Sequence, residues 1–260
     1  MSLISIIVVI VIMMKYGRNK IHFVKLLIAS AVFLLAITYP ALSDVYSSYS
    51  FNAKYFISNE RIDYTIKSLD EKAHGKTIVS MRKIKQMDTD MFLIRYEGNE
   101  GEMKEKWEAK VKIADLSPVS YEKTIEKPKY SASYTGVFHG DNMTLSFRAT
   151  DREPREIVLS RGIKFYFSML MPHLLRNIDF KKGDYYTFSL LLVEDGKFTT
   201  PIIQVKEKEV IQVPAGMYEC WKLNIKLGTE QHYGWYSVKE PHYLIKYSYP
   251  GKELIMEKHS

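Results

Sequence analysis

The chain has 260 residues, of which 46% are hydrophobic and 26% charged, and its formal net charge is +7 at pH 7. Residues 1–43 hold four of the 37 Lys and Arg and none of the 30 Asp and Glu, so the rest of the chain carries a net charge of only +3. This distribution argues against nucleic-acid binding, because the excess of basic residues belongs to the leader and not to a folded domain.

The first 43 residues have the organisation of an export signal. A basic segment, Lys15–Lys25, is followed by an apolar run of 14 residues, and the small residues Ala41 and Ser43 precede Asp44 at the spacing that signal peptidase reads. We therefore expect export, with cleavage between Ser43 and Asp44. The mature protein is then extracytoplasmic, either periplasmic or secreted.

A retained membrane anchor is the alternative to cleavage. Residues 3–14 form a second apolar run ahead of the basic segment, and translation starting at Met13 or Met14 would remove it. Both apolar runs are shorter than the roughly 20 residues that cross a bilayer as a helix. The leader, residues 1–43, thus either ties the protein to the membrane or is removed, and residues 44–60 are expected to form a linker.

Residues 61–260 are expected to form a single antiparallel β domain. In their first half, short runs that alternate apolar and polar residues are separated by turn signals at Gly75, at residues 97–101, at residues 115–118 and at His139–Asn142. Each run predicts a strand that lies beside the previous one, since short connections join neighbouring strands. Two strands are expected around the last of these turns.

The two-residue period breaks once, in Arg161–Phe180. Apolar residues recur there every three or four positions between Ile163 and Ile178, which predicts a largely buried helix. Pro172 is expected to kink this helix or to divide it into two short pieces. In a chain of strands, the place available to such a helix is the open face of the sheet.

The strand period returns after the helix. We expect a turn at residues 181–184, one apolar strand at Tyr185–Val193, and a two-residue hairpin at residues 194–197, centred on its Asp-Gly pair. Residues 201–258 contain several alternating runs separated by Gly- or Pro-bearing turns, which predicts a meander of adjacent strands. Among them, Trp221–Leu227 has apolar residues on one face and polar residues on the other.

The sequence carries no local signature of catalysis. Cys220 is the single cysteine, which excludes an intramolecular disulfide and a multi-cysteine metal site. No two of the seven His residues have the i, i+4 spacing of a helical metal site, and neither a Gly-x-Ser-x-Gly elbow nor a phosphate-binding Gly-rich loop is present. We expect no enzyme, no metal and no cofactor. An exported hydrolase stays open as an alternative, because catalytic residues assemble from distant positions.

Three segments resemble an uncharacterised family of bacterial envelope proteins, known as domain of unknown function 3108. They are DLSPVSYEK at residues 115–123, KKGDYYTF at residues 181–188, and a strand ending in Val-Pro-Ala-Gly at residues 213–216 that precedes a Trp-Tyr-Ser run. The likeness covers most of residues 60–258. The Val-Pro-Ala-Gly segment is its most specific part, and Pro and Gly at these places suit a tight turn.

The resemblance implies a fold similar to the LolA/LolB-like lipoprotein carriers of the bacterial envelope. That fold is mainly β: a curved, incompletely closed antiparallel β-barrel, or half-barrel, with a helical segment packed on its concave face. The chain departs from the pattern in two respects. Its leader has two apolar runs, and it lacks the cysteine that carries a lipid in some envelope relatives.

The expected function is to bind a lipid-like or other hydrophobic small molecule in a cavity between the curved sheet and the helix. The residues expected to line the cavity are Phe165, Phe167, Leu170 and Leu174 from the helix, and Tyr185, Phe188, Trp221 and Leu223 from the sheet. The flexible side chains of Met169 and Met171 would adapt to the ligand's shape. The alternative is a structural or scaffolding envelope protein with a solid core, whose strand edge pairs with a partner protein.

Overall fold

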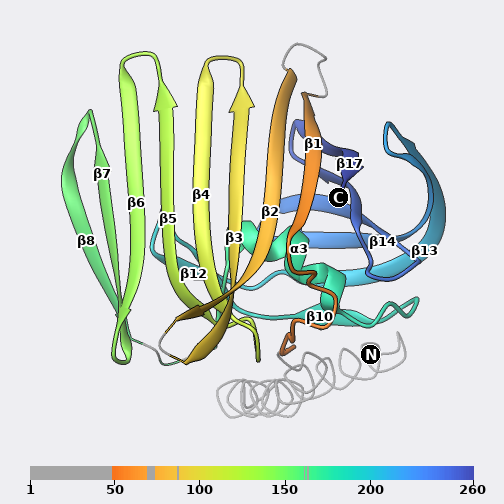
Figure 1. The fold of residues 1–260 in the computed structure, drawn as a ribbon, viewed down its shortest axis with the longest axis horizontal. Coiled ribbons are helices and arrows are strands. Elements are labelled where there is room, and N and C mark those ends of the chain that lie inside the picture. The colour runs from red at the N-terminus through yellow and green to blue at the C-terminus, as the bar shows by residue number, and fades with distance from the viewer. Residues whose placement is uncertain (1–48, 69–73, 87, 161, 163) are drawn as a thin grey trace, which may run out of the picture. The chain divides into compact units, whose positions relative to one another are not determined.

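The structure is a computed structural model that describes residues 49–68, 74–86, 88–160, 162 and 164–260 (Figure 1). The expected cleavage point, Ser43 and Asp44, lies outside the described residues, as do the leader and the first part of the expected linker. Among the described residues, none of the helices has the length and apolar character needed to span a membrane.

Fourteen strands form one antiparallel sheet in the order β10-β13-β14-β15-β16-β17-β1-β2-β3-β4-β5-β6-β7-β8. The strands from the first part of the chain are β1 Glu60–Ser68, β2 His74–Gln86, β3 Thr89–Glu100, β4 Met103–Lys112, β5 Pro118–Lys127, β6 Tyr130–His139, β7 Asn142–Ala149 and β8 Arg152–Ser160. Those from the second part are β10 Tyr185–Thr187, β13 Ile202–Val213, β14 Gly216–Leu227, β15 Glu230–Ser237, β16 Leu244–Tyr249 and β17 Lys252–His259.

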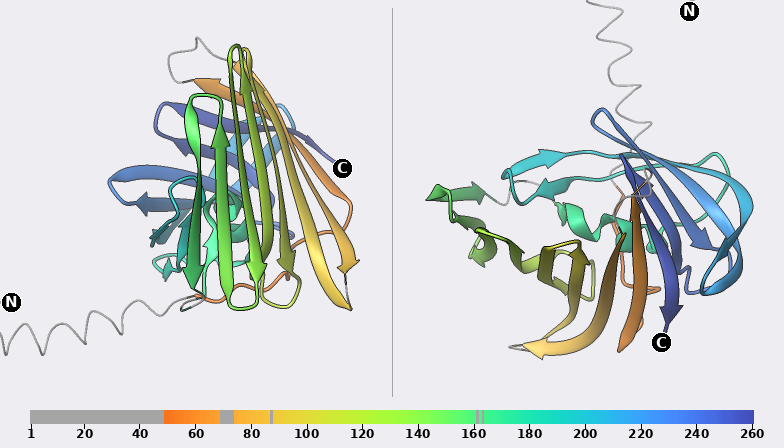
Figure 2. Two further views of the ribbon diagram at one scale, coloured as in Figure 1. Left: turned by 90° about the vertical axis from the view of Figure 1, so that its left-hand side faces the viewer. Right: turned by 90° about the horizontal axis from the view of Figure 1, so that it is seen from above.

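The two ends of the domain meet in the middle of this sheet. The first strand, β1, pairs with the last, β17, and Tyr64 lies opposite Met256. At the far end, the tip of the β13–β14 hairpin bends back, so that the backbone N–H of Ala215 donates a hydrogen bond to the carbonyl oxygen of Met256, 3.4 Å away. Strands β13–β17 and β1 therefore curl into a nearly closed group, which we call the curl (Figure 2).

The opposite end of the sheet stays open. Strands β4–β8, which we call the wing, continue the sheet away from the curl, and β8 is its last strand (Figure 1). The sheet thus bends strongly at one end without closing into a barrel. This confirms the predicted fold class, a curved and incompletely closed antiparallel β structure.

The segment between β8 and β13 fills the concave face of the sheet. It contains a small three-stranded sheet in the order β12-β11-β9, in which β11 runs parallel to β9 and antiparallel to β12. It also contains one helical segment, which hydrogen-bonds to the curl through the Tyr236 hydroxyl and the carbonyl oxygen of Pro172, 2.6 Å apart. The elements of this segment are β9 Tyr166–Phe167, η1 Ser168–Leu170, α3 Met171–Leu174, η2 Leu175–Asn177, β11 Leu190–Leu192 and β12 Lys197–Thr199.

The helical segment differs from its prediction in length and in the place of its proline. It spans Ser168–Asn177 as one α-helical turn between two 3-10 turns, and the preceding residues form β9. Pro172 lies in the first turn of α3, where its missing N–H would have had no partner and its fixed φ suits a helix. The proline therefore neither kinks nor divides a longer helix. Its apolar neighbours are buried because strands surround the segment, not because it is a long helix.

Two further elements correct the sequence prediction. The single strand expected at Tyr185–Val193 is two strands, β10 in the large sheet and β11 in the small one, because the chain crosses between the layers at residues 188–189. The hairpin expected at residues 194–197 has a four-residue connection, Val193–Gly196, between β11 and β12, and Gly196 adopts a φ of 65°. Strand β8 was not expected from the sequence.

The C-terminal meander is confirmed, including its turn. Val213 lies opposite Gly216 in the β13–β14 hairpin, so Pro214 and Ala215 form a two-residue connection. Gly216 has a φ of 134°, which a residue with a Cβ rarely adopts. The resemblance segment Val-Pro-Ala-Gly is therefore the hairpin tip that contacts β17 and closes the curl.

Candidate functional site

The residues predicted from the helical stretch are all buried between the sheet and the small sheet. Phe165 is 3% exposed, and Phe167, Leu170 and Leu174 are 0% exposed. The ring of Phe167 lies 5.4 Å from that of Tyr121 on β5. Phe167 therefore packs against the wing, and all four side chains belong to the buried core on the concave face.

The residues predicted from the strands are more dispersed. Leu223 and Phe188 are buried in the core, and the Phe188 ring packs edge-on against Phe51, with their centroids 4.7 Å apart. Trp221 is partly buried and stacks on Phe180 at 6.4 Å. Tyr185 is 49% exposed on β10. The structure thus brings Phe188 and Leu223 into the filled interior with the helical residues, and places Tyr185 at the surface.

One of the predicted residues lines a hollow. Phe165 lies at a depression of about 330 Å³ where the β4–β5 turn, the end of β6 and the chain after β8 come together. Its other lining residues are Asp115, Ser117, Pro118, Phe138, Gly162 and Lys164. A volume of this size is at the lower limit of a small-molecule site. We refer to this depression as the Phe165 hollow.

The Phe165 hollow has an apolar wall and a charged rim. The Phe165 ring lies 6.1 Å from Phe138 and 5.3 Å from Phe198 of β12. On the rim, Lys164 Nζ lies 3.4 Å from a carboxylate oxygen of Asp115. Burial would raise the pKa of Asp115, but the backbone N–H of Ser117 and the Lys164 charge outweigh burial and lower it. An apolar wall beside an ionised pair suits a molecule with an apolar body and a polar end.

A buried ion pair fixes the helical segment to the curl. Both guanidinium Nη atoms of Arg176 donate to the Glu60 carboxylate, at 2.7 and 3.0 Å, and its Nε donates to the carbonyl oxygen of Pro241 at 3.1 Å. The two side chains are 1% and 2% exposed. No sequence signal could identify this pair, because 115 residues separate its members and neither lies in a motif.

Burial also controls the ionisation of the groups around this pair. The imidazole of His173 is buried next to Arg176, and burial together with that positive charge lowers its pKa to about 3. Burial likewise raises the pKa of the Tyr64 hydroxyl far above its usual value, and this hydroxyl donates to the carbonyl oxygen of Leu244 at 3.2 Å. The group is closed to solvent, so it supports the fold and offers no surface to a substrate.

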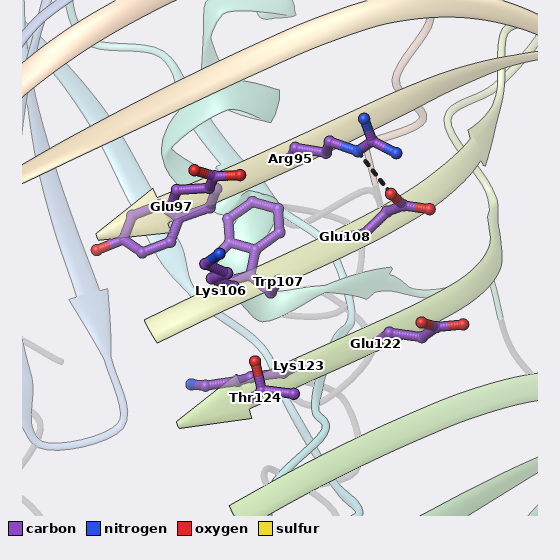
Figure 3. A pocket seen from close by; sticks show the side chains of 9 residues that line it. Arg95, Glu97, Lys106, Trp107, Glu108, Glu122, Lys123 and Thr124 are labelled. Carbon is purple, nitrogen blue, oxygen red and sulfur yellow. Dashed lines mark hydrogen bonds and ion pairs between the residues drawn. The ribbon is translucent and has the colours of Figure 1, made fainter. Parts of the chain in front are cut away.

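A second hollow, of about 210 Å³, lies over β3, β4 and β5 (Figure 3). Arg95, Glu108 and Glu122 lie opposite one another on these strands, and Arg95 Nε donates to Glu108 at 2.7 Å. In the next cross-strand pair, Tyr96 of β3 lies opposite Trp107 of β4. The side chains that border this hollow are mostly charged and solvated, so it is a gap in a sheet face and not an apolar site.

The described residues do not include a group of three or more His, Cys, Asp or Glu that could hold a metal ion. Cys220 is buried, and burial, reinforced by the nearby carboxylates of Glu219 and Glu209, raises the pKa of its thiol to about 12. A thiol with such a pKa is a poor nucleophile at neutral pH.

Comparison with protein families finds a match over residues 75–250 to a model described as a protein of unknown function, DUF3108. No curated protein matches the sequence.

Comparison with solved structures finds matches that share little sequence with this chain. A β-barrel-like protein of domain of unknown function DUF1849 from Brucella abortus is 6% identical, with a TM-score of 0.48, over 78% of this chain and 97% of that one. A proposed exported protein with a YmcC-like fold from Bacteroides fragilis is 9% identical, with a TM-score of 0.31, over 82% and 100%. A proposed lipoprotein from Parabacteroides distasonis is 9% identical, with a TM-score of 0.30, over 82% and 100%.

Proposed function

The chain belongs to the DUF3108 family of proteins of unknown function, and we propose that it is a non-catalytic, extracytoplasmic protein that binds a lipid-like ligand at the Phe165 hollow. The observation that carries the proposal is the hollow itself, in which two Phe rings lie beside the Asp115–Lys164 pair. The pattern of the leader supports export, with the protein released or tethered to the membrane.

The open construction of the wing supports this place for the ligand. The rings of Phe138 and Phe198 belong to two different sheets and both pack on Phe165. Phe198 is 40% exposed on β12, an edge strand of the small sheet. An acyl chain that enters between the two layers would bury this ring and extend the apolar core. Each CH₂ group so buried contributes about 0.8 kcal/mol.

The filled interior supports a ligand at the margin of the core and not deep inside it. Phe51, Tyr166 and Phe188 contact one another edge to face, with centroids 4.7–5.9 Å apart. Rings at these distances are in direct contact, so a ligand there would have to displace them. In this proposal the ligand is lipid-like, as the resemblance to LolA/LolB-like carriers suggests. Its place is between the small sheet and the wing, and not in the interior of the curved sheet.

A pair of variants on β6 tests the proposal. Phe138 lines the hollow, while the adjacent Val137 is 41% exposed and points to the other face of the strand. Phe138→Glu should weaken the binding of a fluorescent fatty acid by more than about tenfold, because a carboxylate would be buried against the acyl chain. Val137→Glu should bind like the unchanged protein.

Native mass spectrometry of the protein purified from a membrane-containing host supplies the second measurement. Co-purified lipid in the unchanged protein and in Val137→Glu, with none in Phe138→Glu, would support the site. Equal binding by both variants, or no binding by any of the three proteins, would overturn the proposal.

A further inference from the structure

The wing ends in an open strand edge. Among the described residues, β8 pairs only with β7, from Arg152 opposite Ala149 to Ser160 opposite Asn142, with one irregularity between Arg152 and Arg155. Its second backbone edge is therefore available to another strand. Most of its side chains are exposed, and Val158 is 63% exposed.

The other end of the large sheet is built differently. Strand β10 has only three residues, and the backbone N–H of Tyr49 donates to the carbonyl oxygen of Thr187 beside it, at 2.7 Å. Further along β13, Val205 exchanges backbone hydrogen bonds with Gly183 and Asp184. A short edge strand covered by loops is a common protection against pairing with other chains. Among the segments that the structure describes, this protection is present at β10 and not at β8.

The two halves of β8 differ in chemistry. Arg152–Glu156 consists of four charged residues and Pro154, which cannot donate a backbone hydrogen bond, and such residues oppose pairing at an edge. The second half, Ile157–Leu159, consists of three apolar residues with high strand propensity. Only the second half offers an edge that another strand can join.

We propose that β8 pairs antiparallel with β8 of a second copy of this chain, with Val158 on the two-fold axis. In this register Val158 faces Val158 of the second copy, and Ile157 faces Leu159. At the ends of the paired segment, Glu156 faces Ser160, so a carboxylate meets a hydroxyl donor. The five residues are thus self-complementary, as an interface between two identical surfaces requires.

The register also continues the side-chain rows of the sheet. On one face, Val137, Thr144 and Val158 lie opposite one another on β6, β7 and β8. Pairing at Val158 doubles this row into six β-branched residues. On the other face, Leu145 lies opposite Ile157, and Met143 lies opposite Leu159. Because Ile157 faces Leu159 of the second copy, the pairing forms an apolar row of four residues: Leu145 and Ile157 of one copy, then Leu159 and Met143 of the other. Apolar cross-strand pairs of this kind stabilise a sheet.

A disulfide at the two-fold axis tests the pairing. Directly opposite residues of antiparallel strands have Cβ atoms about 4.5–5.5 Å apart, which small adjustments bring within disulfide range. Val158→Cys should therefore form a covalent dimer when cells producing the full chain are oxidised. The native Cys220 is 0% exposed and gives no background. Val137→Cys, exposed on the same face two strands from the edge, is the matched control and should form no covalent dimer.

A second experiment tests the register. Ile157→Cys and Leu159→Cys should each give no covalent dimer alone, and a mixture of the two should give one, because each residue faces the other across the axis. Equal yields of dimer from Val158→Cys and Val137→Cys would overturn the proposal. The proposal would also be overturned if Val158→Cys formed no covalent dimer, or if it formed crosslinks only to other proteins.

Discussion

The curl and the wing are parts of one sheet, but the curl is closed at its margins and the wing is open. In the curl, the first and last strands pair, the β13–β14 tip bonds back to β17, and Arg176 is fixed by Glu60 and by the carbonyl oxygen of Pro241. In the wing, β8 has a free edge within the part of the chain that the structure describes, and residues just after β8 line the Phe165 hollow. The margins of the curl are closed by pairing and by a buried ion pair, and both of our proposed binding surfaces, for a ligand and for a second copy, lie on the wing.

The ion pairs of the two regions show the same contrast. Glu60 and Arg176 are nearly unexposed, Lys123 on the wing is 12% exposed between Glu105 and Glu194, and Arg95 with Glu108 lies at the surface with 47% and 30% exposure. Water can replace a lost partner at the surface but not in the interior. Breaking each of them therefore measures how far the curl and the wing differ.

The largest effect is expected from Arg176→Met. This change leaves the Glu60 carboxylate buried without its partner, and removal of one member of a buried pair costs about 3–5 kcal/mol. The free energy of unfolding, measured by urea denaturation, should fall by that amount. The double change Glu60→Leu with Arg176→Met should recover most of the loss, because apolar side chains then replace both charges.

A small loss in Arg176→Met, or a double variant no more stable than the single one, would contradict this assignment. In that case the closure of the curl would rest on its backbone pairing and not on the buried pair.

The next effect concerns pH. The folded state holds the pKa of His173 near 3, below its usual value of about 6.5, so the unfolded chain binds a proton first as the pH falls. The contribution of His173 to stability is therefore complete above about pH 6.5 and is lost between there and pH 3, at about 1.4 kcal/mol for each unit. His173→Leu should show a smaller fall in unfolding free energy between pH 6.5 and 4.

His139, which is exposed at the end of β6, provides the matched control. His139→Asn should keep the pH dependence of the unchanged protein. If His173→Leu also kept the pH dependence of the unchanged protein, a group other than His173 would be responsible for the fall in unfolding free energy.

Local sequence patterns were sufficient for elements whose neighbours follow directly in the chain. The alternation in Trp221–Leu227 predicted one buried face, and Leu223 and Ile225 are 0% exposed. The Val-Pro-Ala-Gly segment predicted a tight turn, and its glycine has the positive φ that such a turn needs. In both cases the physical cause lies within a few residues of the effect, so the sequence displays it.

The remaining features depend on residues far apart in the chain. The pairing of β1 with β17, the crossing between layers within Tyr185–Val193 and the contact of Arg176 with Glu60 all require the folded sheet. The helical prediction failed in length for a related reason. An apolar stripe indicates burial, and in Arg161–Phe180 the burial comes from the short strand β9 and the surrounding strands as much as from a helix. Of the residues that line the Phe165 hollow, the sequence predicted only Phe165 as a cavity residue.

On the wing, a moderate effect is expected from Lys123→Met. Burial opposes the charge of Lys123, but Glu105 and Glu194 outweigh it and raise its pKa, so the side chain is charged between two carboxylates. Its Nζ lies 2.8 Å from Glu194 in the β11–β12 connection and 3.1 Å from Glu105 on β4. Both carboxylates are partly exposed and can become hydrated, so the loss of unfolding free energy should be about 1–2 kcal/mol.

Hydrogen exchange tests the same contact locally. It should increase in residues 193–196, since Lys123 joins that connection to β5. Unchanged exchange there would mean that packing against the wing holds the connection without the ion pair.

The smallest effect is expected from Arg95→Gln. Arg95 and Glu108 lie 2.7 Å apart on neighbouring strands, at the hollow shown in Figure 3, but both remain in contact with water. Solvent-exposed pairs of this kind contribute less than about 1 kcal/mol, and salt weakens them further. Urea denaturation of Arg95→Gln should therefore match the unchanged protein within that amount, and more closely at high ionic strength. A loss as large as that of Arg176→Met would remove the distinction, because an exposed pair between β3 and the wing strand β4 would then contribute as much to stability as the buried pair of the curl.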